Sequence, residues 1–268
     1  MRIKMSNRKR TGLKEKVYKV LKKSLFLCQV YGFGVELKRL CRHGKVDPVV
    51  YIVNHSKKLA YIPIAKVANS SIKASMCEQK LDGVEEYYQI HSLVTKMHKL
   101  DEEAKKYYKF SFVRNPLDRL VSCYVNKYTS DKKYLESKGR LYFDSYLFGY
   151  VRQPKDFTDF IRKICKIPTC LEDQHFQKQY NLLYDKKGNC LVDYVGKYEN
   201  IVEDFEMLEK RFDLKPLPHY NQTSKGNWMD YYTLETAELV HKKYRRDFQV
   251  FGYEDSYRDL VRYLKHKK

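Results

Sequence analysis

The stretch "YIPIAKVANSSIKASM" (Tyr61–Met76) decides how this chain is organised. Its first half is apolar, as in a buried strand, and its second half has the small residues of a loop that enters a helix. Such a loop can bind an anion, because its backbone N–H groups can approach a phosphate. It contains no glycine, and Lys66 precedes the small residues, so the P-loop pattern GxxxxGK[ST] is absent. An ordinary helix cap beside an exposed lysine is the alternative.

Strands and helices alternate through the rest of the chain. Strands are expected at 58–64, 109–113 and 190–196, which are rich in apolar and β-branched residues. Helices are expected at 70–79, 115–128, 200–212 and 234–248. This alternation predicts an α/β fold in which helices flank a P-loop-like parallel sheet. The segment 129–179 is irregular and rich in tyrosine.

The composition is strongly basic, with 53 Lys and Arg against 33 Asp and Glu, a net charge of +20. Such a charge favours anionic partners: nucleic acid, acidic glycans, nucleotides or an anionic membrane surface. Residues 1–45 alone hold 14 basic and two acidic residues. We therefore predict a basic helical N-terminal appendage over 1–48 and a main domain over 49–268. The appendage either packs on the main domain or makes a peripheral contact with a membrane.

Three features bear on the cellular compartment. No apolar run reaches the roughly 20 residues that a membrane span needs, and no signal-peptide pattern follows Met1. Seven scattered cysteines form no CxxC pair and no Cys/His zinc spacing, as expected for reduced thiols. These features predict a cytoplasmic protein, either free or peripheral at the inner membrane face.

A second anion-binding element is predicted in "FVRNPLDRLVSCY" (Phe112–Tyr124). Arg114 stands at the end of a strand, just before a helix capped by Asn115, and Ser122 lies two turns into that helix. An arginine and a hydroxyl so placed can hold a phosphate from two sides. The alternative makes Asp118 and Arg119 a surface ion pair and Ser122 an ordinary buried helix residue.

The lysine-led loop followed by F-V-R-N-P-x-x-R-L-V-S-x-Y resembles the carbohydrate sulfotransferases that use 3′-phosphoadenosine 5′-phosphosulfate (PAPS). The closest resemblance is to the Golgi enzymes that sulfate chondroitin, dermatan and the HNK-1 glycan, and to their bacterial relatives. Three later segments resemble further blocks of that family in the expected order: "EDQHFQKQY" (Glu172–Tyr180), "DYVGKYENIVEDF" (Asp193–Phe205) and "YRRDFQVFGY" (Tyr244–Tyr253). The resemblance covers roughly Lys58 to Tyr253.

This resemblance implies how the donor is bound. The loop that would surround the 5′-phosphosulfate comprises Lys66, Ala68, Asn69, Ser70, Ser71 and Ile72. Lys66 would neutralise charge on the bridging oxygen as the sulfuryl group leaves. Arg114 and Ser122 would hold the 3′-phosphate, and Ser224 and Lys225 would close over the phosphates. Ala65 stands where the family usually has proline.

The resemblance also implies the chemistry. His91 matches the position of a catalytic histidine and would accept the proton of the acceptor hydroxyl. A hydrogen-bonded loop histidine is the alternative, with His98 a rival expected on a helix surface and His175 structural or on the acceptor side. The predicted enzyme moves a sulfuryl group from PAPS to a carbohydrate hydroxyl and releases 3′,5′-ADP.

We expect the acceptor to be an anionic or lipid-linked glycan. No metal is expected, because Lys and Arg supply the positive charge and no ligand spacing is present. A basic nucleic-acid-binding protein is one alternative, although no nucleic-acid motif is present and no nucleic-acid partner is expected. A nucleotide or sugar kinase of the P-loop type is another, although the Walker pattern is absent.

Overall fold

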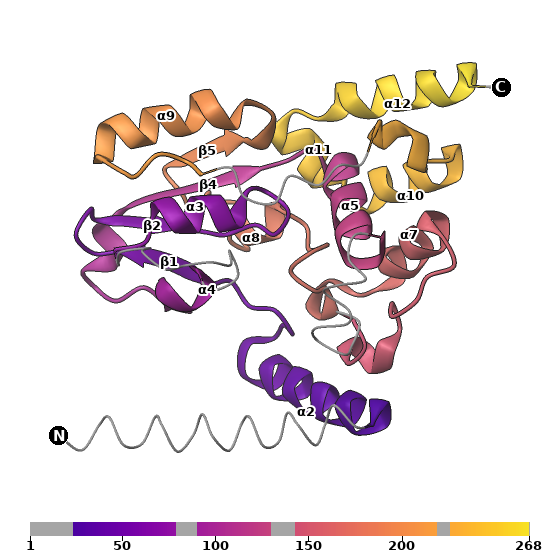
Figure 1. Ribbon diagram of the computed structural model, residues 1–268, viewed down its shortest axis with the longest axis horizontal. Coiled ribbons are helices and arrows are strands. Elements are labelled where there is room, and N and C mark those ends of the chain that lie inside the picture. Colours follow the sequence, from indigo (N-terminus) through magenta and orange to yellow (C-terminus); the bar gives the residue numbers. More distant parts are fainter. Residues whose placement is uncertain (1–23, 79–89, 130–142, 219–225, 268) are drawn as a thin grey trace.

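A five-stranded sheet forms the centre of the computed structural model in Figure 1, which describes residues 24–78, 90–129, 143–218 and 226–267. The strand order is β3-β1-β2-β4-β5. The strands are β1 (Tyr51–Asn54), β2 (Leu59–Tyr61), β3 (Thr95–Met97), β4 (Tyr108–Val113) and β5 (Tyr194–Lys197). Strands β2, β4 and β5 run parallel, whereas β1 pairs antiparallel with both β2 and β3. The predicted α/β class is confirmed, but the sheet is mixed and only part of it is parallel.

Strand β4 shows why the centre of the sheet is stable. Phe110 and Phe112 are fully buried on one of its faces, and Ser111 on the other donates a hydrogen bond to the carbonyl of Ile62 at 2.7 Å. The register places Gly196 of β5 opposite Phe112. A Cβ atom at Gly196 would collide with the ring of Phe112, so glycine is the residue that lets this ring pack against β5.

Helices surround the sheet, as Figure 1 shows. They are α3 (Asn69–Ser75), α4 (Ile90–Leu93), α5 (Pro116–Tyr124), α7 (Phe157–Lys166), α8 (Tyr180–Leu183), α9 (Ile201–Phe212), α10 (Leu234–Lys243), α11 (Arg245–Phe251) and α12 (Glu254–His266). The helix predicted at 115–128 is α-helical only to Tyr124 and continues as a π-helical turn, η2 (Val125–Thr129). The helix predicted at 234–248 is divided into α10 and α11 at Tyr244.

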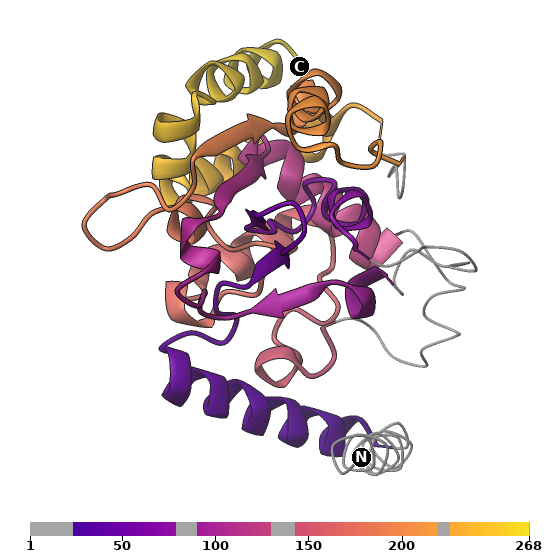
Figure 2. The same ribbon diagram turned by 90° about the vertical axis from the view of Figure 1, so that its left-hand side faces the viewer.

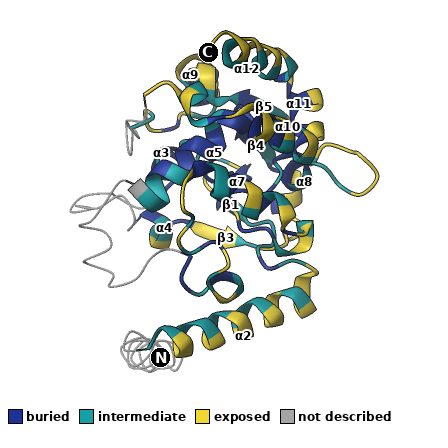
Figure 3. Ribbon diagram, turned by 90° about the vertical axis from the view of Figure 1, so that its right-hand side faces the viewer, coloured by how far each residue is buried: buried dark blue, intermediate teal, exposed yellow. Residues whose placement is uncertain are grey.

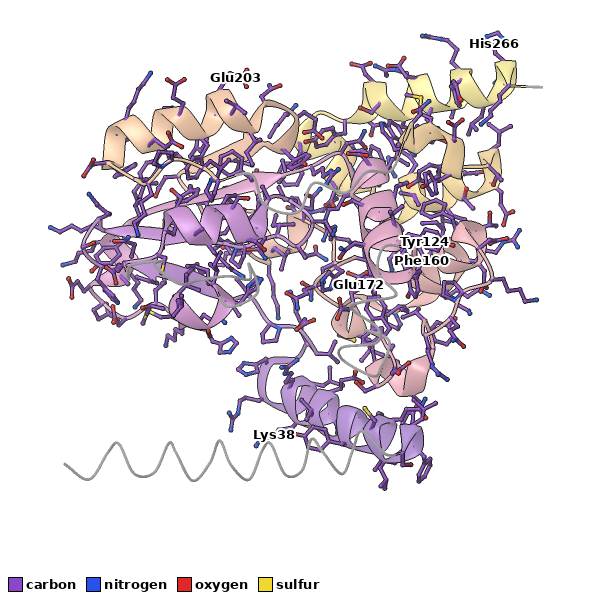
Figure 4. The ribbon with its side chains drawn as sticks, viewed as in Figure 1. Lys38, Tyr124, Phe160, Glu172, Glu203 and His266 are labelled. Atoms are coloured by element: carbon purple, nitrogen blue, oxygen red, sulfur yellow. The ribbon has the colours of Figure 1, made fainter. Side chains whose placement is uncertain are left out.

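Aromatic side chains fill the space between α5 and α7. The rings of Tyr124 and Phe160, labelled in Figure 4, have centroids 5.6 Å apart, and Phe157 meets Tyr124 edge-on at 5.3 Å. Phe143 and Phe176 extend this cluster at a spacing of 6.0 Å. The described part of the irregular, tyrosine-rich segment therefore contributes to the core, because aromatic pairs add to the burial of apolar area.

The helix α2 (Leu25–His43) lies apart from the sheet, along the lower side of the molecule in Figures 1 and 2. It rests on the short 3-10 helix η3 (Tyr146–Gly149), where the Gln29 side chain donates a hydrogen bond to the Phe148 carbonyl at 3.1 Å. No residue of α2 is fully buried, as Figure 3 shows. The division into residues 1–48 and 49–268 stays a prediction, since residues 1–23 lie outside the described part.

None of the helices in the described part of the chain combines the length and the apolar character needed to cross a membrane.

Candidate active site

A cavity of about 1330 Å³ opens where the chain leaves β2 and β4. Most of the residues predicted for the site line it: Lys66, Ala68, Asn69, Ser70, His91, Arg114 and Ser122. Ser71 and Ile72 are buried in α3, and Ser224 and Lys225 lie outside the described residues. The structure thus brings the two predicted anion-binding elements to one wall.

The charge of the cavity is strongly positive. Its described lining contains two carboxylates, those of Asp47 and Asp118, against a larger set of basic residues: Lys38, Arg39, Arg42, Lys66, Lys73, Lys96, Arg114 and Lys127. A concave surface lined by charges of one sign concentrates ligands of the opposite sign. The cavity therefore suits a ligand with several negative charges.

The lysine-led loop follows β2 in a strained conformation. Lys66 has φ = +70° and Ala68 has φ = +44°, values that cost free energy in residues other than glycine. Two arginines hold the loop in place: Arg114, which directly follows β4, and Arg119 of α5. Nε of Arg119 donates to the Ala65 carbonyl at 3.0 Å, and Nη1 of Arg114 donates to the Lys66 carbonyl at 2.8 Å. These bonds explain how a loop without glycine keeps left-handed residues.

Lys66 is half-buried on the cavity wall, so the alternative of an exposed lysine beside a helix cap is wrong. Burial lowers its pKa to about 8, and the nearby charges of Lys127 and Arg114 act in the same direction. A negative charge placed beside this amine opposes both effects, because it stabilises the ammonium form and so raises the pKa of Lys66. The ammonium form of Lys66 is therefore most stable when an anion occupies the cavity.

Arg114 pairs with Asp118, four residues further along the chain. Its Nη2 lies 2.7 Å and its Nε 2.8 Å from the Asp118 carboxylate, while its guanidinium stacks on the ring of Tyr198 at 4.1 Å. These contacts fix the plane of the guanidinium beside the loop. Ser122, which is buried on α5, lines the same cavity.

Arg119 does not form the expected surface ion pair with Asp118. Its side chain is fully buried and donates hydrogen bonds to three backbone carbonyls, those of Ala65, Gln177 and Gln174. The surface interpretation is wrong because Asp118 is held by Arg114, while the side chain of Arg119 is buried in the core. Arg119 thus ties the loop to the segment 174–177.

His91 faces the loop from α4. Its Nε2 lies 3.5 Å from Oγ of Ser70, and its Nδ1 lies 3.0 Å from Nζ of Lys73. Burial, followed by the charge of Lys73, lowers the pKa of His91 to about 4. The imidazole is therefore neutral near pH 7, which is the state in which it can accept a proton.

Two lysines on the cavity wall had no predicted role, and two histidines that were considered in the sequence also line it. Lys73 lies three residues after Ser70 in α3, a helical spacing that would have placed it on the same face. Lys127 lies in the π-helical turn η2, a feature that local sequence patterns do not reveal. His98 follows strand β3 and not a helix, and its ring stacks on His43 at 5.4 Å. His175 also lines the cavity, with its Nδ1 2.7 Å from Asp173.

Within the described ranges, no group of three or more His, Cys, Asp or Glu side chains could hold a metal ion.

Comparison with known proteins identifies the class. The sulfotransferase family matches residues 50–254. Carbohydrate sulfotransferase 14 of Danio rerio is 28% identical over 170 residues, which are 56% of this chain and 44% of the relative. Carbohydrate sulfotransferase 12 of Xenopus laevis is 25% identical over 178 residues (58% and 42%), and carbohydrate sulfotransferase 14 of Homo sapiens is 27% identical over 168 residues (55% and 42%). No solved structure matches the chain.

The predicted cytoplasmic location is wrong, because these relatives are carbohydrate sulfotransferases of the Golgi lumen. The prediction used the lack of a signal peptide or membrane anchor. This chain spans less than half the length of the relatives that it matches, so the point at which it begins says nothing about such segments.

The match extends from β1 to the start of α12 and includes the lysine-led loop, Arg114 and the segment from Glu172 to Tyr180, all of which meet at the cavity. This chain belongs to the sulfotransferase family.

Proposed function

We propose that this protein transfers the sulfuryl group of PAPS to a hydroxyl group of a carbohydrate. The observation that carries the proposal is the meeting of Lys66, Arg114 and Ser122 on one cavity wall, with the Arg114 side chain bonded to the Lys66 carbonyl at 2.8 Å. Two anion-binding elements joined in this way suit a donor with negative groups at both its 5′ and 3′ positions. The family match does not support the nucleic-acid-binding or kinase alternatives.

The residues present fit this donor. The loop after β2 is P-loop-like in its order of strand, loop and helix, and it offers the Lys66 amine and the Ser70 hydroxyl to the phosphosulfate. Arg114, oriented by Asp118, would hold the 3′-phosphate together with Ser122. The cavity exceeds the roughly 300–1,000 Å³ of ordinary ligand pockets, which leaves room for an acceptor sugar beside the donor.

The side chains supply what the transfer needs. PAPS supplies the sulfuryl group, which leaves the bridging phosphate oxygen as the acceptor oxygen attacks sulfur. Lys66 stabilises the negative charge that develops on that leaving oxygen. His91, neutral near pH 7, takes the proton of the acceptor hydroxyl at Nε2, the ring nitrogen that faces Ser70. The products are a sulfate ester and 3′,5′-ADP.

We infer further that the acceptor is an anionic or lipid-linked glycan. The C-terminal half of α2 contributes Lys38, Arg39 and Arg42 to the cavity, and Lys96 of β3 adds a fourth cation. Figure 4 labels Lys38 on this helix. Because these cations lie outside the donor loop, they would meet negative groups of the acceptor.

A peripheral membrane contact of α2 is supported by a separate observation. Six large apolar side chains of this helix are exposed: Phe26, Leu27, Val30, Tyr31, Phe33 and Leu37. Exposed apolar surface on this scale is unusual in a monomeric soluble protein and is typical of interaction sites. A helix with such a face and with Lys and Arg beside it suits the surface of a bilayer.

Transfer of radiolabelled sulfate from PAPS to a panel of glycans tests the main proposal. The wild type should label at least one glycan. Lys66→Ala should abolish transfer, and Arg114→Ala should weaken 3′,5′-ADP binding by at least tenfold. His91→Ala should lose turnover while it still binds 3′,5′-ADP. Arg162→Ala removes an arginine that is exposed and paired with Glu235 away from the cavity, so it should behave as wild type.

Unchanged 3′,5′-ADP affinity in Arg114→Ala would remove that residue from the 3′-phosphate site. Retained turnover in His91→Ala would remove His91 as the base.

A further inference from the structure

Lys73 is a buried lysine whose contacts the proposed function does not explain. The residue is only 6% exposed on α3, and Nζ lies 3.0 Å from Nδ1 of His91. Within the described ranges no carboxylate lies within ion-pair distance of this amine. A buried charge without a counterion is costly, so the environment of Lys73 favours its uncharged form.

Among the described residues, the charged or titratable groups with the largest effect on this pair are basic and come from four elements. Besides His91 of α4, they are Lys96 of β3, Lys127 of η2 and His175 of the segment before α8. Burial, together with the charge of Lys96, lowers the pKa of Lys73 to about 7. Both protonation states of Lys73 are therefore populated in the physiological range.

The protonation state of Lys73 determines which tautomer of His91 its hydrogen bond allows. An ammonium group only donates hydrogen bonds, so a charged Lys73 donates to Nδ1 and leaves the single proton of a neutral imidazole on Nε2. That nitrogen faces Ser70 and the loop, and with its proton in place it has no lone pair for the acceptor hydroxyl. An uncharged amine can instead accept a hydrogen bond from Nδ1–H, which puts the lone pair on Nε2.

We propose that Lys73 is the positioning residue of His91: its uncharged amine accepts the hydrogen bond of Nδ1–H, and so directs the lone pair of Nε2 toward the donor loop. The inference rests on the proposed role of His91 as the base. In the transfer step the acceptor O–H bond breaks, its proton goes to Nε2 while Nδ1–H stays bonded to Lys73, and the new O–S bond replaces the bond from sulfur to the phosphate oxygen. Lys73 gives up and takes up no proton in this step.

The tautomer of His91 can be measured directly. In the full-length protein with ¹⁵N-labelled histidine, long-range ¹H–¹⁵N spectra distinguish Nδ1–H from Nε2–H, and His91→Gln assigns the signal. We expect the proton to move from Nε2 to Nδ1 as the pH rises through about 7. Turnover should rise over the same range. The midpoint should be higher in kcat than in kcat/KM for PAPS, because bound PAPS adds negative charge that raises the pKa of Lys73.

Two substitutions separate the hydrogen bond from packing. Lys73→Arg keeps a long side chain that always donates, so Nε2 should carry the proton at every pH and kcat should fall about 100-fold or more, with 3′,5′-ADP affinity changed less than about threefold. Lys73→Gln offers an amide oxygen that accepts from Nδ1–H without titrating, so turnover should persist and its rise near pH 7 should disappear. The control Lys96→Met removes a neighbouring cation and should keep the rise, moved to higher pH.

Wild-type turnover in Lys73→Arg, or a proton on Nε2 at every pH in the active wild type, would overturn the inference. If Lys73→Arg loses 3′,5′-ADP binding, the test is the pH profile of turnover in Lys73→Gln. A rise of turnover near pH 7 that persists in this variant contradicts the proposed role of Lys73. His91→Ala separates the two levels. If His91→Ala loses turnover but Lys73→Arg keeps wild-type turnover, only the proposed role of Lys73 is wrong. If His91→Ala keeps its turnover, the proposed role of His91 as the base is wrong as well.

Discussion

Replacing Arg119 with methionine tests whether a buried cation holds the donor loop. The guanidinium donates to the carbonyls of Ala65, Gln177 and Gln174 at 2.7–3.1 Å. A hydrogen bond from a charged donor contributes about 1.5–3 kcal/mol, and a buried carbonyl left unpaired is costly in itself. Methionine recovers the apolar packing and removes the desolvation cost of the charge, so the net loss is smaller than the three bonds together.

Three bonds of this kind amount to about 4.5–9 kcal/mol, and the regained packing and the relieved desolvation offset part of this, which leaves about 3–5 kcal/mol. We therefore expect the free energy of unfolding of Arg119→Met to fall by that amount, and the midpoint of thermal unfolding by about 6–15 °C at about 2–3 °C per kcal/mol. Urea denaturation followed by circular dichroism measures the first quantity. Arg162→Met is the matched control, because its pair with Glu235 is half exposed and should contribute less than about 1 kcal/mol.

The same substitution should also weaken 3′,5′-ADP binding at temperatures where the variant is folded, because the loop loses the bond at Ala65. A destabilisation below about 1 kcal/mol, equal to that of the control, would refute the view that this arginine anchors the loop.

Two further outcomes are expected. Lys66 is charged below its pKa of about 8, so the dissociation constant of 3′,5′-ADP should be nearly constant below pH 8 and should rise toward tenfold per pH unit above it. Calorimetry with Lys66→Met, which should bind weakly at every pH, checks the assignment, and a wild-type constant that stays flat to pH 9.5 would contradict it. The chain should co-sediment with vesicles of phosphatidylcholine and phosphatidylglycerol, and Phe26→Ser/Val30→Ser/Leu37→Ser should abolish this binding. The matched control Val202→Ser/Met207→Ser removes exposed apolar residues of α9, and equal loss in both variants would argue against a contact through α2.

Local pattern was enough to predict the elements that hold the donor site. The apolar run before Lys66, the small residues after it, and the Asn115–Pro116 helix start are short-range signals, and α3 and α5 begin close to where these signals indicated. The pairing of Arg114 with Asp118 could also have been predicted, since the two residues are four positions apart. Local pattern could not predict which charged side chains are buried, and Arg119 is fully buried although its sequence context indicates a surface position.

The rest depends on contacts between distant segments. The antiparallel pairing of β1 with β3 joins residues more than 40 positions apart, and neither strand is long enough to give a clear alternation. The place of α2 beside the cavity is set by its contact with η3, which joins Gln29 to Phe148. Ala65 drew attention as the residue in place of proline, yet the left-handed residues are its neighbours Lys66 and Ala68.

The two lysines of the loop and α3 show how one cavity can require opposite protonation states of the same side chain. Both are removed from bulk water, and burial lowers the pKa of each. In the proposed reaction, Lys66 lies beside the phosphosulfate, whose negative charge restores its ammonium form, and it acts as a cation. Lys73 lies behind His91, where it can accept a hydrogen bond from Nδ1–H only when it is uncharged. The difference does not come from the residue type but from what each amine faces: a group that arrives with negative charge in one case, and an imidazole N–H in the other. A purely electrostatic account of this basic cavity would assign both lysines to the donor, and the 3.0 Å contact with Nδ1 of His91 is the reason to separate them.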